Sequence, residues 1–441
     1  MKTFPQGIQV GHKKEATASL PIESATLPRR VVLPLQQNLG VPAEPLVQVG
    51  DAVAEGQKIA DSSKFISAPI HAPITGKITG IEKRITASGV LAPAIVLEAA
   101  ADLPADPFPR EKRHWKELSG EEIRRIVREA GIVGLGGATF PAHVKLSPPA
   151  EKKIAAVIIN GCECEPYLTV DHRLMLERSA DVLAGARAAA RAVGADRIIF
   201  GIEDNKPDAI QVIAREIAGE GLPGAEVVPL KTKYPQGGEK MLIKALLGRE
   251  IPSGGLPMDV GAVVHNVGTA AAIAEAVESG KPLIERVVTV TGGGIRTPRN
   301  LRVRIGTAFA EVIGQCGGLA DDAAKVIMGG PMTGTAVSSL ECPVVKATSS
   351  ILVLTRKEVG SFAEGVCIRC GRCIKACPVG LMPNRLAEDF QLKNWEQVEK
   401  GHVTDCIECG CCTYVCPARL FLVQNFKVAK RELQLRKAVR P

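Results

Sequence analysis

The amino-acid sequence predicts a multi-domain chain of the α/β and α+β classes. Three observations support this: a turn-rich extended segment over residues 41–98, alternating helical and apolar extended segments from about residue 119, and two cysteine-rich runs near the C-terminus. With 441 residues and 46% hydrophobic content, the chain is long enough for three or four domains, each with its own core. We expect the divisions to be 1–118, 119–280, 281–355 and 356–441.

The segment 41–98 reads as short alternating strands separated by turns at Gly50-Asp51, at Gly56 and at several prolines. Its turns, VGDAVAEGQ and APITGKI, are similar to those of lipoyl and biotinyl barrel-sandwich domains. In that family a lysine at the tip of the central hairpin carries the cofactor. Here the tip falls near residues 62–65, and Lys64 lacks the expected Asp-Lys or Met-Lys setting. We therefore expect a lipoyl-like barrel-sandwich fold without its cofactor, and a structural role for Lys64.

From about residue 119, helical patterns alternate with apolar strands. The expected elements are helix 120–130, strand 154–159, helix 171–193, strand 197–202, helix 206–219 and strand 226–230. This succession predicts a doubly wound, Rossmann-like parallel sheet. After Lys281 the chain is rich in strands again, with VVTVTGGGI, LRVRIGT and KVIMGGPM as candidate strands of a small β-grasp-like unit.

Two copies of the pattern CxxCxxCxxxCP stand near the C-terminus, and their spacing is that of bacterial two-cluster ferredoxins. Eight thiolates at this spacing suit two [4Fe-4S] clusters, so the chain is expected to move single electrons. Because the fourth cysteine of each run ligates the other cluster in such tandems, we assign two crossed sets. The sets are Cys367, Cys370, Cys373 and Cys416 for cluster 1, and Cys377, Cys406, Cys409 and Cys412 for cluster 2. A disulfide framework or paired zinc sites fit this repeated cysteine spacing poorly. Cys411 is interpreted as a packed neighbour. We expect residues 356–441 to form a helical ferredoxin-like domain followed by a basic tail that includes Lys427, Lys430 and Arg440.

A glycine-rich segment, GIVGLGGATFPAHVK, spans residues 131–145. Clustered glycines let backbone N–H groups approach a phosphate, and the lysine that follows adds positive potential. The segment is not the GxGxxG fingerprint, because the third glycine would fall at Thr139, so an ordinary Rossmann NAD site is not supported. Taken alone, such a loop is more often a tight turn than a binding site.

Three later segments favour a binding site over a tight turn. They are NGCECEP at 160–166, YPQGGE at 234–239 and HNVGT at 265–269. Together with the glycine-rich loop they resemble, in order and spacing, the flavoprotein subunit of respiratory complex I. The resemblance implies FMN held by Gly134, Gly136, Gly137, Lys145, Asn160, Glu163, Tyr234, Gly237, Asn266 and Thr269. Glu163 and Glu165 would be the catalytic carboxylates, with Glu163 at the isoalloxazine and Glu165 facing the nicotinamide nucleotide.

The sequence departs from that pattern at three positions, where it has Cys162, Gly238 and His265. Cys162 and Cys164 with His172 lack a fourth metal ligand and are better interpreted as packed thiols. Cys316 and Cys342 are expected in the core.

Composition limits the function. The formal charge is +8 but aromatics are only 3%, so we expect anionic cofactors, partners or lipid headgroups and not nucleic acid. The first residues show no apolar signal segment, and uncharged stretches are too short and too broken to span a bilayer. Any membrane association is therefore expected to be peripheral.

Taken in order, the four parts resemble the C subunits of Rnf complexes, which are ion-translocating ferredoxin:NAD oxidoreductases. The resemblance covers residues 1–420, including the start around Gly7, Gly11 and His12. It implies a peripheral electron-input subunit at the cytoplasmic face of the cell membrane, which oxidises NADH at FMN, or reduces NAD in reverse, and relays electrons through two [4Fe-4S] clusters. The implied partners are the other Rnf subunits, above all the ferredoxin-like iron–sulfur subunit, with ferredoxin served indirectly. Alternatives are a soluble flavin and iron–sulfur reductase related to cobalamin reductase, and an electron-carrying scaffold without nucleotide turnover.

Overall fold

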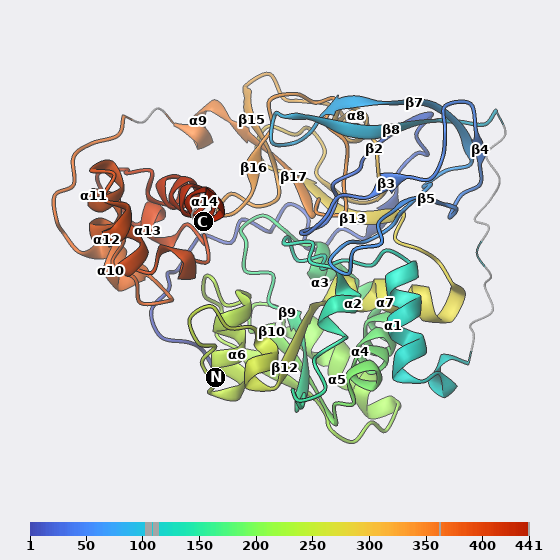
Figure 1. Ribbon diagram of the computed structural model, residues 1–441, viewed down its shortest axis with the longest axis horizontal. Coiled ribbons are helices and arrows are strands. Elements are labelled where there is room, and N and C mark those ends of the chain that lie inside the picture. Colours follow the sequence, from blue (N-terminus) through green and yellow to red (C-terminus); the bar gives the residue numbers. More distant parts are fainter. Residues whose placement is uncertain (102–107, 109–113, 361–362, 440–441) are drawn as a thin grey trace.

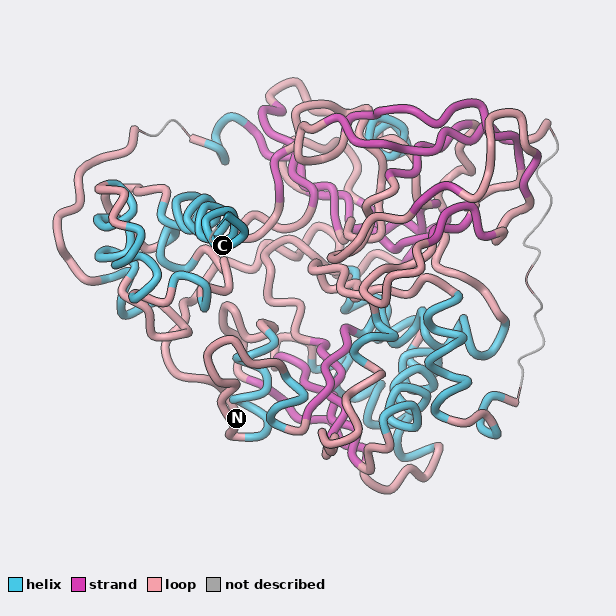
Figure 2. The backbone as a smooth tube through the Cα atoms, viewed as in Figure 1, coloured by secondary structure: helices cyan, strands magenta, loops and turns pink. Residues whose placement is uncertain are grey.

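The computed structural model describes residues 1–101, 108, 114–360 and 363–439. Two β-rich parts lie side by side above an α/β part, and a separate helical unit lies at one end of the molecule (Figures 1 and 2). The N-terminal segment starts beside the α/β part and then runs between the upper and lower parts (Figure 1). This placement brings it into contact with Glu163, Glu165 and Tyr234.

The barrel-sandwich part consists of two small sheets. Its strands are β2 (Arg30–Pro34), β3 (Glu44–Pro45), β4 (Ala52–Val53), β5 (Lys58–Asp61), β6 (Ile70–His71), β7 (Gly76–Ile85) and β8 (Leu91–Ala99). They are ordered β2-β8-β7-β4 and β3-β5-β6. Alternation along the strands turns Val31, Leu33, Ile59, Ile78 and Ile95 inward, and all five are fully buried. The prediction of a barrel-sandwich fold is confirmed.

The α/β part has four parallel strands in the order β11-β10-β9-β12. They are β9 (Ala156–Gly161), β10 (Arg197–Glu203), β11 (Ala225–Leu230) and β12 (Ala262–Asn266). The helical elements are η1 (Trp115–Glu117), α1 (Gly120–Glu129), α2 (Ala142–Lys145), α3 (Val170–Glu177), α4 (Ser179–Val193), α5 (Pro207–Gly219), α6 (Glu239–Leu247), η2 (Pro257–Val260) and α7 (Val267–Ser279). Val157 and Ile159 pack into one core, whereas Ala156 and Ile158 pack with α6 on the other face. The sheet is therefore covered on both faces, as predicted.

The expected single helix over 171–193 is wrong, because the chain forms α3 and α4 with a break at Arg178. This residue has φ of −135° and ψ of 33°, outside the helical region. Its guanidinium pairs with Asp181 at 2.8 Å and with Glu275 of α7 at 3.1 Å. The break lets α4 lie against α7 so closely that a Cβ on Gly185 would be 1.7 Å from the carbonyl of Ala270. Tertiary packing thus overrides a continuous helical pattern.

The third part is a six-stranded sheet in the order β1-β14-β13-β17-β15-β16. Its elements are β1 (Ile22–Ser24), β13 (Glu285–Thr291), β14 (Arg299–Arg304), α8 (Phe309–Gln315), β15 (Ala323–Met328), β16 (Thr335–Ala336), β17 (Ser350–Thr355) and α9 (Arg356–Val359). The strand β1 comes from the N-terminal segment and pairs in parallel with β14. The segment before the barrel-sandwich strands thus completes a sheet made mainly from residues after 284.

The helical unit comprises α10 (Arg372–Ala376), α11 (Pro383–Gln391), α12 (Trp395–Lys400), η3 (Val403–Asp405), α13 (Cys411–Tyr414) and α14 (Leu422–Val439). It has its own core, to which the expected basic tail contributes Phe426 and Leu433 from α14. Lys430 in this helix pairs with Glu408 at 2.7 Å, whereas Arg440 lies outside the described residues. Among the described helices, none has the length and apolar character to cross a membrane.

Candidate functional site

Two predicted site residues lie where the strand order reverses. Asn160 on β9 and Asn266 at the end of β12 are direct partners in the parallel register. Ligands of open α/β sheets bind outside the carboxyl ends of the strands at such a switch point. Asn160 donates a hydrogen bond to the carbonyl of Gly237 at 2.8 Å, and Asn266 accepts one from the N–H of Gly268 at 2.8 Å. The two asparagines therefore mark one sheet edge suited to a ligand.

The glycine-rich loop crosses this edge. The loop turns back on itself, because the N–H of Gly134 donates to the carbonyl of Phe140 at 2.8 Å. The N–H of Leu135 donates to the hydroxyl of Thr269 at 2.8 Å. A Cβ at Gly136 would lie 3.3 Å from the side chain of Asn266, whereas one at Gly137 would meet nothing within 4 Å. Gly137 also has φ of 118°, a conformation that favours glycine. The loop thus presents bare backbone at the switch point, which fits a phosphate-bearing ligand.

Lys145 and the start of α6 form a second wall of the site. The ammonium of Lys145 pairs with Glu239 and donates to the carbonyl of Val264 at 3.2 Å. A Cβ at Gly237 would lie 3.2 Å from Cys162, so this glycine also allows a close approach of two segments. The predicted lysine and glycine are therefore brought to the same edge as the asparagines.

Glu163 is held in the site by a residue that the sequence analysis missed. Its carboxylate accepts a 2.7 Å hydrogen bond from the N–H of Asp171 and lies 3.5 Å from the ammonium of Lys14. Lys14 is only 9% exposed, and it also donates to the carbonyls of Glu163 at 2.8 Å, Glu165 at 3.1 Å and Leu168. Burial lowers the pKa of Lys14. One buried cation therefore holds both predicted catalytic glutamates in one turn.

Asp171 and Arg286 add buried polar groups that the sequence analysis also missed. The carboxylate of Asp171 accepts a 2.6 Å hydrogen bond from Asn266, and burial together with the charge of Glu163 raises the pKa of Asp171 to about 7. Both residues line one pocket at this sheet edge. Within the described part of the chain, the Nη1 atom of Arg286 is buried without a hydrogen-bond partner. A buried donor without a partner next to a bare glycine loop fits a polar, anionic group such as a flavin phosphate.

Glu165 binds through its carboxylate to the third part of the molecule. Its carboxylate accepts hydrogen bonds from the N–H of Met332 at 3.1 Å and from the hydroxyl of Thr333. Burial raises the pKa of Glu165. The two predicted catalytic glutamates are therefore close in sequence but have different partners, one in the N-terminal segment and one in the third sheet.

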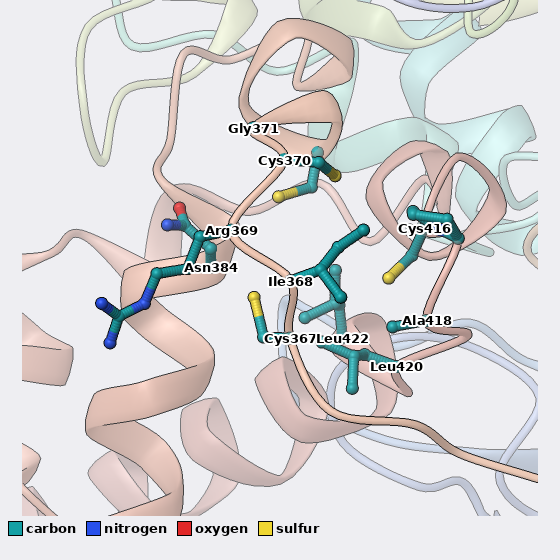
Figure 3. A pocket seen from close by; sticks show the side chains of 12 residues that line it. Cys367, Ile368, Arg369, Cys370, Gly371, Asn384, Cys416, Ala418, Leu420 and Leu422 are labelled. Carbon is teal, nitrogen blue, oxygen red and sulfur yellow. The ribbon is translucent and has the colours of Figure 1, made fainter.

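The cysteines of the two runs line two cavities in the helical unit. The first cavity is lined by Cys367, Cys370, Cys373 and Cys416 among other residues. Figure 3 shows the sulfurs of Cys367, Cys370 and Cys416 around this common space. Cys367 and Cys370 are exposed, and so are Val366 and Ile368 beside them, at 86% and 68%.

The second cavity is lined by Cys377, Cys406, Cys409 and Cys412, together with Cys411. All of these are buried or partly buried. Across the described residues, no three His, Cys, Asp or Glu side chains converge as ligands of one metal ion do. The four ligands of a [4Fe-4S] cluster stand around its corners and do not converge on one ion. In each of the two cavities, the fourth cysteine of one run lies with the first three of the other run.

Tyr234 joins the two halves of the site. It is 2% exposed, and its hydroxyl donates a 2.7 Å hydrogen bond to the carbonyl of Cys409. Its ring packs with Val10 of the N-terminal segment and with Ala376 and Cys411 of the helical unit. The second cysteine cavity is therefore in direct contact with the α/β part, whereas the first lies at the surface.

The remaining cysteines are packed side chains. Cys162 is buried and Cys164 is partly buried, and burial raises the pKa of both thiols. His172 does not turn to them but pairs with Asp208 at 2.9 Å. Cys316 and Cys342 are buried in the apolar core of the third part.

Family models match four successive stretches of the chain. They are the RnfC barrel sandwich hybrid domain at residues 2–102, the Nuo51 FMN-binding domain at 127–275, the SLBB domain at 287–336 and the 4Fe-4S dicluster domain at 366–420. The SLBB match confirms the prediction of a β-grasp, soluble-ligand-binding-like unit for the third part. The chain is thus built from an FMN-binding part and a part for two [4Fe-4S] clusters.

Two curated proteins are similar over most of the chain. The C subunit of the proton-translocating ferredoxin:NAD(+) oxidoreductase complex of Clostridium ljungdahlii is 50% identical over 88% of this chain and 84% of its own length. The C subunit of the Na(+)-translocating complex of Acetobacterium woodii is 44% identical over 98% and 97%. A solved NAD+-reducing [NiFe]-hydrogenase in the H2-reduced state has the same fold over 72% of this chain and 62% of its own, with a TM-score of 0.50 and 20% identity.

Proposed function

The chain belongs to the family of C subunits of ion-translocating ferredoxin:NAD(+) oxidoreductase complexes, and from this premise we propose that it is the electron-input subunit of such a complex. It oxidises NADH, or reduces NAD in the reverse direction, and relays single electrons to its partners. The observation that carries the proposal is the hydrogen bond from Tyr234 to Cys409, because it links the flavin-type site to an iron–sulfur site. FMN, when bound, supplies the conversion between a two-electron hydride and single electrons.

The input site is assigned to the carboxyl edge of β9 and β12. Gly134, Gly136, Gly137, Lys145, Asn266 and Thr269 hold the phosphate and ribityl part of FMN, and Asn160, Glu163, Tyr234 and Gly237 contact its ring. Support comes from the convergence of these residues at one switch point and from the unpartnered Nη1 atom of Arg286 nearby. In this assignment Lys14 orients Glu163, because its ammonium lies 3.5 Å from that carboxylate.

Glu165 is assigned to the nicotinamide side of the site. The ammonium of Lys14 donates to the backbone carbonyl of Glu165 at 3.1 Å and also to that of Glu163. The two glutamates therefore lie in one rigid turn. The carboxylate bonds to Met332 and Thr333 in the loop between β15 and β16. This loop orients the carboxylate until a nucleotide arrives.

The relay is assigned to two crossed ligand sets. Cys377, Cys406, Cys409 and Cys412 hold the inner cluster, and Cys367, Cys370, Cys373 and Cys416 hold the outer cluster. The lining of the two cavities supports this crossing. Since Tyr234 contacts the inner set only, electrons pass from the input site to the inner cluster and then to the outer one.

The outer cluster is the proposed exit. Exposed Val366 and Ile368 lie beside its cysteines, with exposed Arg369 and Arg372 in the same stretch. An apolar surface flanked by cations fits an acidic electron-carrying protein. We assign this partner to the ferredoxin-like iron–sulfur subunit of the complex, which would hold the chain as a peripheral subunit at the cytoplasmic face of the membrane. Ion translocation is assigned to the partners.

The proposal is tested anaerobically with purified protein that has been reconstituted with FMN and with iron and sulfide. Addition of NADH should bleach the flavin absorption first and the broad cluster absorption second. A reconstituted protein whose flavin is unaffected by NADH would instead be an electron-carrying scaffold without nucleotide turnover.

A further inference from the structure

The wall of the outer cavity contains one side-chain amide, that of Asn384. This residue stands in the first turn of α11 and lines the cavity together with the four cysteines of the outer set (Figure 3). Among the described residues, its Oδ1 atom is buried without a hydrogen-bond partner. Buried polar side-chain atoms are nearly always hydrogen-bonded. An amide in this state, in a wall lined by thiols, fits a group with which the amide can form a hydrogen bond.

The repeated motif gives a direct comparison with the inner cavity. Asn384 is the seventh residue after Cys377, and Val423 is the seventh residue after Cys416. Val423 lines the inner cavity, as Asn384 lines the outer one. At equivalent positions of the repeat, the outer cavity therefore has an amide and the inner cavity has an apolar side chain.

The backbone N–H groups at these two positions differ in the same sense. The N–H of Asn384 donates to the sulfur of Cys373, a ligand of the outer set. The N–H of Val423 donates instead to the hydroxyl of Thr413 at 3.1 Å. The position of Thr413 is taken in the first run by Ile374, which has no hydroxyl. The wall around Asn384 is thus richer in donors toward sulfur than the wall around Val423.

Such donors change the reduction potential of a cluster. A [4Fe-4S] cluster gains one negative charge when it is reduced, so a hydrogen bond to its sulfurs stabilises the reduced form and raises the potential. An asparagine amide has two N–H donors, and rotation of the amide exchanges its oxygen and its NH2 group. A valine side chain has no donor and leaves the potential unaided.

We propose that the side-chain amide of Asn384 donates a hydrogen bond to a sulfur of the outer cluster and raises the reduction potential of that cluster relative to the inner one. The inference rests on the proposed function and gives its relay a direction. One electron leaves the inner cluster as the outer cluster gains it, and the hydrogen bond stabilises the product of this step.

An anaerobic redox titration of the reconstituted protein, followed by electron paramagnetic resonance, tests this directly. Dithionite and mediators set the potential, and the outer cluster is the one whose signal is lost in Cys416→Ala. In Asn384→Val the ratio of reduced to oxidised outer cluster at a fixed potential should fall roughly fivefold, a shift of about 40 mV for a one-electron couple. The potential of the inner cluster should not change. Asn425→Val is the matched control, because Asn425 is a half-buried asparagine of α14 that is not among the lining residues of either cavity.

The reciprocal variant Val423→Asn should raise the potential of the inner cluster and leave that of the outer cluster unchanged. An unchanged outer potential in Asn384→Val, or an equal shift of both clusters, would overturn the inference. If the iron content shows that Asn384→Val loses the outer cluster, Val423→Asn decides, and an unchanged inner potential then overturns it. If NADH fails to bleach the flavin of the wild type, the proposed function fails, whereas the titration still decides the role of Asn384 because it uses no NADH.

Discussion

The inner and outer cysteine cavities are lined by equivalent positions of one repeated motif, yet their surroundings differ. The inner cavity contacts the α/β part through Tyr234 and has no exposed cysteine among its lining residues. The outer cavity has two exposed cysteines and exposed apolar neighbours. Solvent exposure and hydrogen bonding set the potential of an iron–sulfur cluster. The comparison teaches that the fold, and not the motif, gives the two clusters different tasks.

The largest effect is expected from the fourth cysteines. Cys377→Ala should remove the inner cluster, so that NADH reduces the flavin but not the remaining cluster. Cys416→Ala should remove the outer cluster and leave an NADH-reducible one. Electron paramagnetic resonance after NADH addition distinguishes the two variants, with about half the iron lost in each. Cys411→Ala is the control that should keep both clusters. An NADH-reducible cluster in Cys377→Ala would break the crossed assignment.

The second-largest effect is expected at Lys14, which holds the turn that carries Glu163 in the flavin site. Lys14→Met would leave the buried carboxylate of Glu163 without its cation, and losing one partner of a buried pair costs about 3–5 kcal/mol locally. We expect faster amide hydrogen exchange in residues 163–168 and weaker FMN retention, with an unchanged outer cluster signal. Lys13→Met is the matched control for FMN retention, because Lys13 is exposed and its ammonium donates to the side-chain hydroxyl of Tyr167, at 3.0 Å, whereas Lys14 holds the backbone carbonyls of the turn and the carboxylate of Glu163. Equal FMN loss in both variants would contradict the role of Lys14.

The next effect is expected from the two arginines beside the outer cavity, whose positive charge would attract an acidic partner. The double variant Arg369→Glu with Arg372→Glu should slow electron delivery to an acidic partner subunit about tenfold at low salt, with a smaller effect at high salt. Reduction of both clusters by NADH, followed spectroscopically, should not change. Lys393→Glu, at an exposed position after α11, should deliver electrons at the wild-type rate. If delivery stays normal in the double variant, the partner uses another face.

The smallest effect is expected at the contact between the inner cavity and the α/β part. Tyr234→Phe keeps the ring but removes the 2.7 Å hydrogen bond to Cys409, a contact that contributes about 1 kcal/mol. Amide exchange in residues 406–412 should accelerate by up to about fivefold, and residues 367–373 should exchange as before. Equal acceleration in both loops would show that Tyr234 stabilises the helical unit as a whole.

Local patterns in the sequence predicted much of this architecture. The helix expected at 120–130 is α1, which begins at Gly120 after a capping box formed by Ser119 and Glu122. The crossed cysteine sets were assigned from the spacing within each run and from the crossing that such tandems show, and the asparagines came from the resemblance of four ordered motifs. Each motif is a short run of neighbouring residues, so it can be recognised without a structure.

Contacts between distant segments left no such pattern. Lys14 meets a turn about 150 residues away, and Glu165 meets Met332. Tyr234 bonds to the helical unit at Cys409. The break at Arg178 also depends on a partner on another helix, Glu275. In the sequence, Lys13 and Lys14 are two adjacent charges that would ordinarily both be solvated. Only the fold shows that Lys14 is buried.

The pairing of β1 with β14 has a consequence for the order of synthesis. Residues 22–24 are made before their partners at 300–302, which follow nearly 280 residues later. Contacts of such sequence separation form late in folding. The strand β1 must therefore wait, unpaired, while the barrel-sandwich and α/β parts are made, whereas Lys14 can reach the turn at Glu163 once the α/β part exists. The site for the flavin is completed only when the third sheet supplies Arg286 of β13, which delays stable cofactor loading until that sheet has been translated.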